Sequence, residues 1–273
     1  MGFNIENLIV DRPLRATLFD KTTSEVIFTI DQITDPSLEC TSESAEVRDA
    51  IGSKITEFDR SKDASFSGSN AIISLGLMAA QFGSNKEVAS ATNKIVVPKF
   101  EIIELGETGG VVNGNITLAE TPKTTLKYIY RLASDKSISE KIGAGTTATT
   151  EFTISNKEIT LPTTPAVAYV ATDRFAVWYD FECDGSSEGL GAVRVSNMAE
   201  AFARGGKIDI EMLFADICNP NVKYYGHIVS NNAKMDGNVS LTFNNETTHG
   251  FSIKIMQDYC STNKKLFDII IPE

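Results

Sequence analysis

The sequence predicts a mainly β protein, a β-sandwich or split β-barrel packed by one α-helix. Short β-branched runs with alternating apolar and polar residues recur along most of the chain, separated by turn residues, and this is the pattern of half-buried strands. One apolar run, residues 71–82, breaks the alternation and has helix-capping residues at its borders. Because the strands are short and closely spaced, we expect antiparallel pairing to dominate.

Seven short strands are expected before the C-terminal third. They cover residues 16–19, 25–30, 94–97, 126–130, 151–154, 157–161 and 175–182. Between the second and third of these, residues 39–59 have a charged middle between two strand-like ends. We expect this segment to form a long hairpin or loop.

Residues 71–82 predict one buried helix. Ser69 and Asn70 can cap its first turn, and Gly83 can end it. Because the run is apolar nearly all round, it should pack against a sheet. A second, shorter helical turn is expected around residues 197–202.

The C-terminal third has the clearest strand alternation. Residues 207–214 place four large apolar side chains on one face, whereas Asp209 and Glu211 lie on the other. Together with the strand-like runs that follow, this predicts one continuous sheet with a solvated face. Those runs are residues 238–243, 251–255 and 266–271.

The 273 residues are expected to form a single domain, residues 1–273. Residues 105–173 are richer in Thr, Gly and Pro than their surroundings. They form either elaborated hairpins of that domain or a small outer lobe, and the sequence leaves both open.

Charge and composition exclude several classes of function. The net charge is −11 and Lys and Arg form no cluster, so a nucleic-acid-binding surface is not expected. The longest nearly apolar stretch, residues 71–80, is shorter than the roughly 20 residues of a membrane-spanning helix. The cysteines contain no CxxC pair, so we expect buried free thiols and no zinc or redox site. They are Cys40, Cys183, Cys218 and Cys260.

Two motifs resemble catalytic or cofactor sites, but each lacks the element that it requires. Residues 185–189 match the GxSxG nucleophile string, yet no helix pattern follows, and neither His227 nor His249 can be placed beside Ser187. Residues 143–148 match the dinucleotide fingerprint GxGxxA, but a strand follows them where a helix is needed. We therefore expect no catalysis, no cofactor and no bound metal.

The order of several segments carries a family resemblance. They are the charged hairpin VRDAIGSKI (47–55), the strand ASFSGSNA (64–71), the strand pair EFTISNKEITLP and FAVWYDFE (151–182), and the final strands KMDGNVSLTF and FSIKIMQDYC (234–260). With the apolar helix after the second segment, this order resembles the tail tube proteins of long-tailed bacteriophages. The resemblance covers roughly residues 10–85 and 150–273.

The resemblance implies a ring-forming structural subunit of the virion tail, made in the host cytoplasm. In that family six subunits close into a ring, and rings stack into a hollow tube through which DNA passes without specific binding. The other implied partners are a tape-measure protein and, in contractile tails, a sheath protein, with no membrane. The resemblance does not separate contractile from flexible tails, or a phage tube from a bacteriocin or injection-system tube.

Two sets of residues are candidate sites within such a tube. Asp209 and Glu211 are hypothesised to face the lumen, where negative charge would repel DNA phosphates; any solvated face is the alternative. The charged segment 43–54 is hypothesised to contact a neighbouring subunit or the next ring, with plain solvated surface as the alternative. Its charged residues in question are Glu43, Glu46, Arg48, Asp49 and Lys54.

A second class of function is also open. A non-catalytic β-sandwich binding module, such as a tail accessory or a carbohydrate-binding adhesive protein, would share the acidic, Thr-rich composition. It would be expected to have exposed aromatic residues for sugar stacking. Here Trp178 is interpreted as a core or interface anchor in preference to a ligand-stacking ring. Polymeric state separates the two classes.

Overall fold

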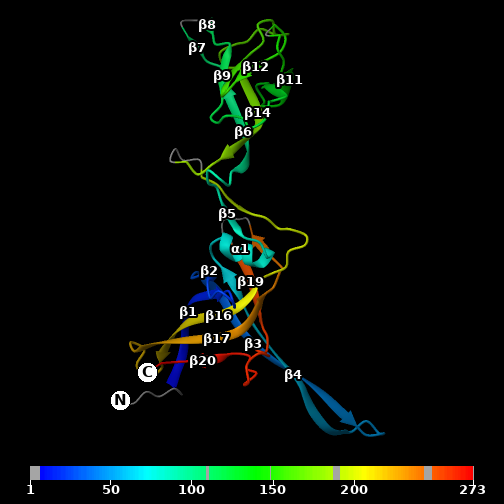
Figure 1. Cartoon of the computed structure of the whole chain (residues 1–273), viewed down its shortest axis with the longest axis vertical. Coiled ribbons are helices and arrows are strands. Elements are labelled where there is room, and N and C mark those ends of the chain that lie inside the picture. The colour runs from blue at the N-terminus through cyan, green and yellow to red at the C-terminus, as the bar shows by residue number, and fades with distance from the viewer. Residues whose placement is uncertain (1–6, 109–110, 148, 187–190, 243–247, 273) are drawn as a thin grey trace. The chain divides into compact units, whose positions relative to one another are not determined.

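The chain is mainly β and falls into two compact units (Figure 1). This computed structural model describes residues 7–108, 111–147, 149–186, 191–242 and 248–272. The first unit comprises Met1–Lys86 and Val195–Glu273, and the second comprises Glu87–Arg194. The expected mainly β class with several sheets is confirmed, and the described strands close no barrel.

The first unit contains a nine-stranded sheet in the order β2-β1-β16-β17-β19-β4-β3, with β18 paired to β19 and β20 paired to β17. Every pairing in this sheet is antiparallel among the described residues, as expected. Its strands are β1 (Leu8–Phe19), β2 (Val26–Ile30), β3 (Ile33–Arg48), β4 (Lys54–Asn70), β16 (Gly205–Asp216), β17 (Lys223–Met235), β18 (Ser240–Thr242), β19 (Thr248–Ile255) and β20 (Asp268–Ile270).

One face of this sheet forms the core of the first unit. Alternation along β16 buries Ile208 and Ile210, as the sequence predicts, and they pack with Leu18 of β1 and Ile253 of β19. Leu77 and Ala80 of helix α1 (Leu75–Phe82) complete the same cluster. The helix therefore packs on the sheet, as expected.

The start of the helix differs from the prediction. Ser69 and Asn70 belong to strand β4, and the cap is Ser74, whose hydroxyl accepts a hydrogen bond from the Leu77 N–H. The predicted end is confirmed, because Gly83 adopts the left-handed conformation at φ 68°. The predicted run is also less buried than expected, since Leu75 in the first turn of the helix is exposed, as are Ile72 and Ile73 before it.

The second unit is built from shorter strands in several small sheets. A four-stranded sheet has the order β11-β10-β14-β6, a three-stranded sheet has the order β12-β13-β9, and two pairs are β5-β15 and β7-β8. The strands are β5 (Lys86–Val88), β6 (Ile95–Glu104), β7 (Glu107–Thr108), β8 (Val111–Val112), β9 (Asn115–Thr117), β10 (Tyr128–Leu132), β11 (Ile138–Gly143), β12 (Thr153–Ser155), β13 (Glu158–Thr160), β14 (Arg174–Cys183) and β15 (Val193–Val195).

Polar ties accompany the apolar core of the second unit. Phe152, Phe175 and Ile159 are fully buried in that core. Beside them the nearly buried guanidinium of Arg131 donates to the backbone carbonyls of Val167 (2.8 Å) and Ala168 (3.0 Å) and pairs with Asp173. Such a group is stable away from water only because its donors are satisfied.

Two other sequence predictions are wrong. Residues 197–202 form a turn flanked by irregular backbone in place of a helical turn. Of the four free cysteines only Cys183 is buried; Cys40, Cys218 and Cys260 are exposed, because they lie on a solvated hairpin and in surface loops. Among the described residues no helix is long and apolar enough to cross a membrane.

Candidate functional site

The β3–β4 hairpin extends beyond the other strands of its sheet (Figure 1). Near its base, Leu38 packs on the core and the opposing Phe66 is buried. Beyond the pair Thr41 and Asp63, nearly every residue of both strands is exposed. We call residues 41–63 the arm. The arm is a two-stranded ribbon with no core of its own, a form that is marginally stable alone in water.

The turn at the end of the arm is held by Asp49. Its carboxylate accepts hydrogen bonds from the N–H groups of Ile51 (3.0 Å) and Ser53 (2.7 Å). Gly52 supplies the positive φ of 90° that the turn needs. Asp49 was a candidate for contact with a neighbouring subunit. Here its carboxylate instead shapes the turn of its own chain.

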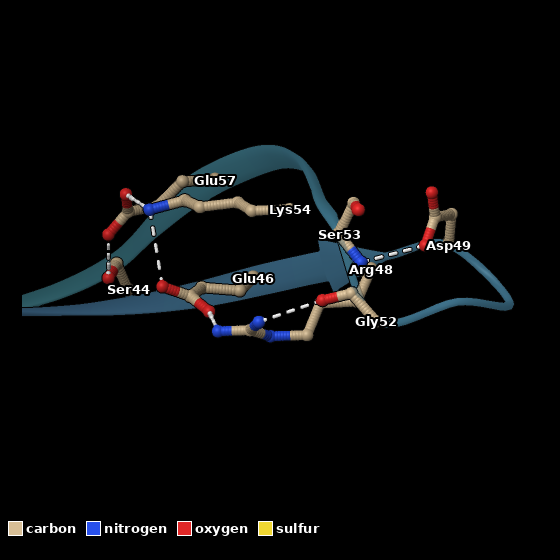
Figure 2. Close-up of polar contacts among 8 residues, drawn as sticks. All are labelled: Ser44, Glu46, Arg48, Asp49, Gly52, Ser53, Lys54 and Glu57. Atoms are coloured by element: carbon tan, nitrogen blue, oxygen red, sulfur yellow. Dashed lines mark hydrogen bonds and ion pairs between the residues drawn. The ribbon is translucent and has the colours of Figure 1, made fainter.

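One face of the arm carries a network of charges (Figure 2). Lys54 pairs with both Glu46, at 3.2 Å, and Glu57. Arg48 pairs with Glu46 and donates to the Gly52 carbonyl at 3.0 Å. The hydrogen bond between Lys54 and Glu57 raises the pKa of Lys54 and lowers that of Glu57. These contacts join the two strands of the arm.

The opposite face of the arm is apolar. The register places Ala45 opposite Phe58 and Val47 opposite Thr56, so these four side chains share a face and alternate with the charged residues. Phe58 is 59% exposed and Val47 is 43% exposed. Ile51, in the turn, is almost fully exposed. Exposed apolar groups gathered in this way mark surfaces that bind partners.

The outer side of β3 is also a free sheet edge. In the strand order β3 stands last, and no other described strand pairs with it beyond β4. A 16-residue edge presents a row of backbone N–H and C=O groups that can pair with another strand.

The two acidic residues of β16 lie together on the face opposite the core, as predicted. Glu211 pairs with Arg15 of β1 at 3.0 Å. The Asp209 carboxylate lies 3.0 Å from Nδ1 of His227 on β17. Arg15 therefore offsets part of the negative charge of this face, whereas His227 gives Asp209 a hydrogen-bond partner.

The structure brings some of the candidate residues together and separates others. Glu46, Arg48 and Lys54 form one network, whereas Glu43 accepts from Ser61 at 3.4 Å further down the arm. Sequence analysis missed Val47 and Phe58. Apolar residues at alternate positions within a charged hairpin were the available signal.

The other motifs give no site. Of the GxSxG string, Ser187, Glu188 and Gly189 lie outside the described residues. Gly143 ends β11, and the next regular element is the strand β12. No group of three His, Cys, Asp or Glu residues suited to a metal ion occurs in the part of the chain that the structure describes. Trp178 was interpreted as a core or interface anchor; it is 51% exposed, so it is not a core residue, and its role as an interface anchor stays a prediction.

Comparison with known proteins gives one family. A sequence model described as the YomU/Tube protein family matches residues 8–269, nearly the whole chain. No curated protein matches it. The family match spans both units and includes the arm and the acidic face of β16.

Proposed function

This chain belongs to the YomU/Tube protein family, an assignment to phage tail tube proteins, and from that premise we propose that it assembles into stacked hexameric rings forming a hollow conduit for the genome. The family match is the observation that carries the proposal. It makes the chain a structural component of a phage tail. Rings, stacking and genome passage are the finer steps that the proposal adds.

The first unit has the features that such an assembly needs. A heterologous contact joins two different surfaces of identical subunits, and it closes into a ring or continues as a filament. The free edge of β3 and the apolar face of the arm provide one such surface. Contact with a second copy would remove both Phe58 and the edge from water.

The charged face of the arm has a supporting role in this proposal. Glu46, Arg48 and Lys54 hold the two strands together, and Asp49 fixes the turn. An arm of defined shape loses less conformational entropy when it docks on a neighbour. Glu43 is free to contribute to the contact, since its only hydrogen bond with a described residue is a long one to Ser61.

We place Asp209 and Glu211 on the lumen. Each copy has a net charge of −11, so a closed ring concentrates acidic surface around its opening. Arg15 beside Glu211 offsets part of this charge. A mixed surface of this kind gives DNA no continuous basic track to bind. A structure of the tube with both acids on its exterior would refute this placement.

Negative-stain electron microscopy of the purified full chain tests the proposal, together with size-exclusion chromatography over a concentration series. Hollow tubes or six-fold rings are the expected result. Particles that stay monomeric or trimeric at every concentration, also when the chain is co-expressed with the other tail genes, would contradict it.

A deletion variant tests the role of the arm. Removing Val47–Gly52 shortens the ribbon without touching the core, so the protein should fold and fail to polymerise. Val111→Ser is the matched control, because it removes an exposed apolar side chain from β8 of the second unit. Normal tubes from the deletion variant would leave the arm without a role in assembly.

A further inference from the structure

The four-stranded sheet of the second unit has an unusual outer face. Along β14 the inward residues Phe175 and Val177 are fully buried, as strand alternation requires. Trp178, which follows Val177, points outward, where a polar residue would be expected. Its partner on the neighbouring strand β6 is also aromatic, Phe100. A solvated sheet face normally carries polar residues, so these rings need another explanation.

Four aromatic rings gather on this face, which we call the aromatic platform: Phe100, Tyr128, Tyr130 and Trp178. The rings of Phe100 and Trp178 lie 4.6 Å apart at an angle of 32°. Tyr130 meets Trp178 edge-on at 5.6 Å, and the Lys141 amine sits 3.6 Å from the Tyr128 ring centre. The contacts fix the rings in position while leaving Phe100 and Trp178 each about half exposed.

An open pocket of about 580 Å³ lies over the platform, bounded by the rings and by residues 124–128. This volume falls within the range of small-molecule sites, roughly 300–1,000 Å³. All its lining residues belong to the second unit. The pocket is therefore complete within one unit of one chain.

Polar groups with unused hydrogen-bonding capacity surround the rings. Four residues with polar side chains, Thr124, Thr125, Lys127 and Asp180, are among those that line the pocket. None of these four side chains makes a hydrogen bond or ion pair with another described residue. The Trp178 indole N–H is likewise without a partner in the described part of the chain. The pocket thus combines ring faces with donors and acceptors, which is what a ligand with one apolar and several polar sides requires.

We propose that the aromatic platform binds a neutral sugar of a polysaccharide, with one pyranose ring stacked on Trp178. The C–H groups on one face of a pyranose carry a slight positive charge and pack on the electron-rich face of an aromatic ring. Its hydroxyls lie around the edge of the ring, where Thr124, Thr125 and Asp180 can bond them. No other surface of the described residues joins stacked exposed rings to such groups.

Charge favours a neutral ligand over an anionic one. Lys127 and Asp180 contribute one unpaired charge of each sign, and the Lys141 amine beside the pocket is engaged with the Tyr128 ring. The other lysine of the pocket, Lys99, is paired with Glu101 at 3.1 Å. A phosphate or a polyanion would need an excess of cationic donors that the pocket lacks.

The charged border of the platform favours a small ligand over a second copy of the chain. A stable contact between two proteins buries roughly 800 Å² on each partner. The platform is bordered by charged side chains that are already paired, Arg174 with Glu104 and Lys94 with Glu182. A protein docked over this border would remove water from those ion pairs, and this costs free energy that no new ion pair would offset.

The chain offers a direct readout, because Trp178 is its single tryptophan. The experiment titrates the full chain with lactose, maltotriose and chitotriose while tryptophan emission is recorded. We expect a saturable blue shift with at least one of them, at sugar concentrations up to about 20 mM, as suits an open site with few contacts. Phe100→Ala should weaken that binding about tenfold, because it removes the ring that supports Trp178.

Two further variants keep the test decisive. Thr125→Val keeps the side-chain shape and removes one hydroxyl, so it should weaken binding by about fivefold even if Phe100→Ala fails to fold. Tyr225→Ala removes an equally exposed aromatic ring from the first unit and should leave binding unchanged. Circular dichroism confirms the fold of each variant.

Two results with the unaltered chain would overturn the proposal. One is an emission spectrum that stays constant with all three sugars. The other is a blue shift that follows protein concentration without sugar, which would make the platform a contact between copies. Equal weakening by Tyr225→Ala and Phe100→Ala would also place the sugar elsewhere.

Discussion

The two units hold their sheets in different ways. The first unit uses long strands and one helix around an apolar cluster that includes Leu18, Ile210 and Leu77. Its buried polar side chains, such as Gln81 and His249, make no ion pair with a described residue, whereas the second unit buries a charged one. The second unit uses short strands, and buried polar side chains such as Arg131 and Tyr179 connect them. The Tyr179 hydroxyl donates a hydrogen bond to Glu101 at 2.7 Å. Burial raises the pKa of Tyr179 above its usual value, so the hydroxyl keeps its proton.

The exposed apolar residues of the two units differ in what lies behind them. Those of the arm lie on a ribbon with water on both faces, so the arm itself gains stability when a partner covers it. Those of the aromatic platform lie on a sheet whose other face is a finished core. The platform is stable without a partner, and its rings are therefore available for a ligand.

Replacing Arg131 should have the largest effect on the second unit. Arg131→Met leaves Asp173 and two loop carbonyls without their donor, and the loss of one member of a buried pair costs about 3–5 kcal/mol. Hydrogen exchange should show lost protection across residues 87–194 while β16 and α1 remain protected. Urea denaturation measures the free energy of unfolding.

Arg174→Met is the matched control. Arg174 also pairs with an acid of the second unit, Glu104, but both side chains are about half exposed. Its loss should change the free energy of unfolding by less than about 1 kcal/mol. Equal effects of the two variants would mean that the buried Arg131–Asp173 pair stabilises the second unit no more than the exposed Arg174–Glu104 pair does.

A pair of glycines tests the helix of the first unit. Gly83 has φ 68°, and a Cβ there would lie 1.9 Å from the Phe202 carbonyl oxygen, so Gly83→Ala should destabilise the protein by about 1–3 kcal/mol. A Cβ at Gly76, within α1, would only touch Phe28 at 3.5 Å. Gly76→Ala should therefore stabilise the protein by about 0.5–1 kcal/mol. Thermal melts with the same sign for both variants would contradict this account.

Much of the fold could be predicted from local patterns. The alternation in residues 207–214 placed Ile208 and Ile210 in the core and Asp209 and Glu211 outside it, as the structure shows. Gly83 marked the end of the helix because few other residues adopt its conformation. The helix start was misplaced because Asn70 is both a good cap and, here, the last residue of β4, where pairing with His249 decides its conformation.

The sites were less predictable because exposure depends on distant pairing. Phe66 is buried and Phe58, on the same strand, is exposed. The residues around each phenylalanine in the sequence do not predict this difference. That difference arises because β19 pairs with β4 only from Ala64 onward. The sequence could not exclude Trp178 from the core for a related reason, since alternation gives two faces but not which one meets the core.

Acid should destabilise the first unit through His249. This buried histidine lies 2.7 Å from the Gln81 side chain of α1, and burial lowers its pKa from 6.5. The unfolded chain then binds the proton more readily, so stability is intact above about pH 6.5 and falls as the pH drops through the lowered value. In His249→Gln, the free energy of unfolding measured by urea denaturation should change by less than about 1 kcal/mol between pH 7 and pH 5, whereas the control His227→Gln should keep the pH dependence of the unaltered chain.

Phe58→Ala should have the smallest effect on the unassembled chain. Its ring is 59% exposed, so its loss should change the free energy of unfolding by less than about 0.5 kcal/mol. Phe66→Ala, on the same strand, removes a ring that is 2% exposed and should cost about 3–5 kcal/mol. Polymerisation, followed by light scattering, should nevertheless be impaired by Phe58→Ala, because the arm needs its apolar face only when a neighbour covers it. Unimpaired polymerisation of Phe58→Ala would contradict the proposal that a neighbour covers the apolar face of the arm. The arm would then not differ from the platform in its role in assembly.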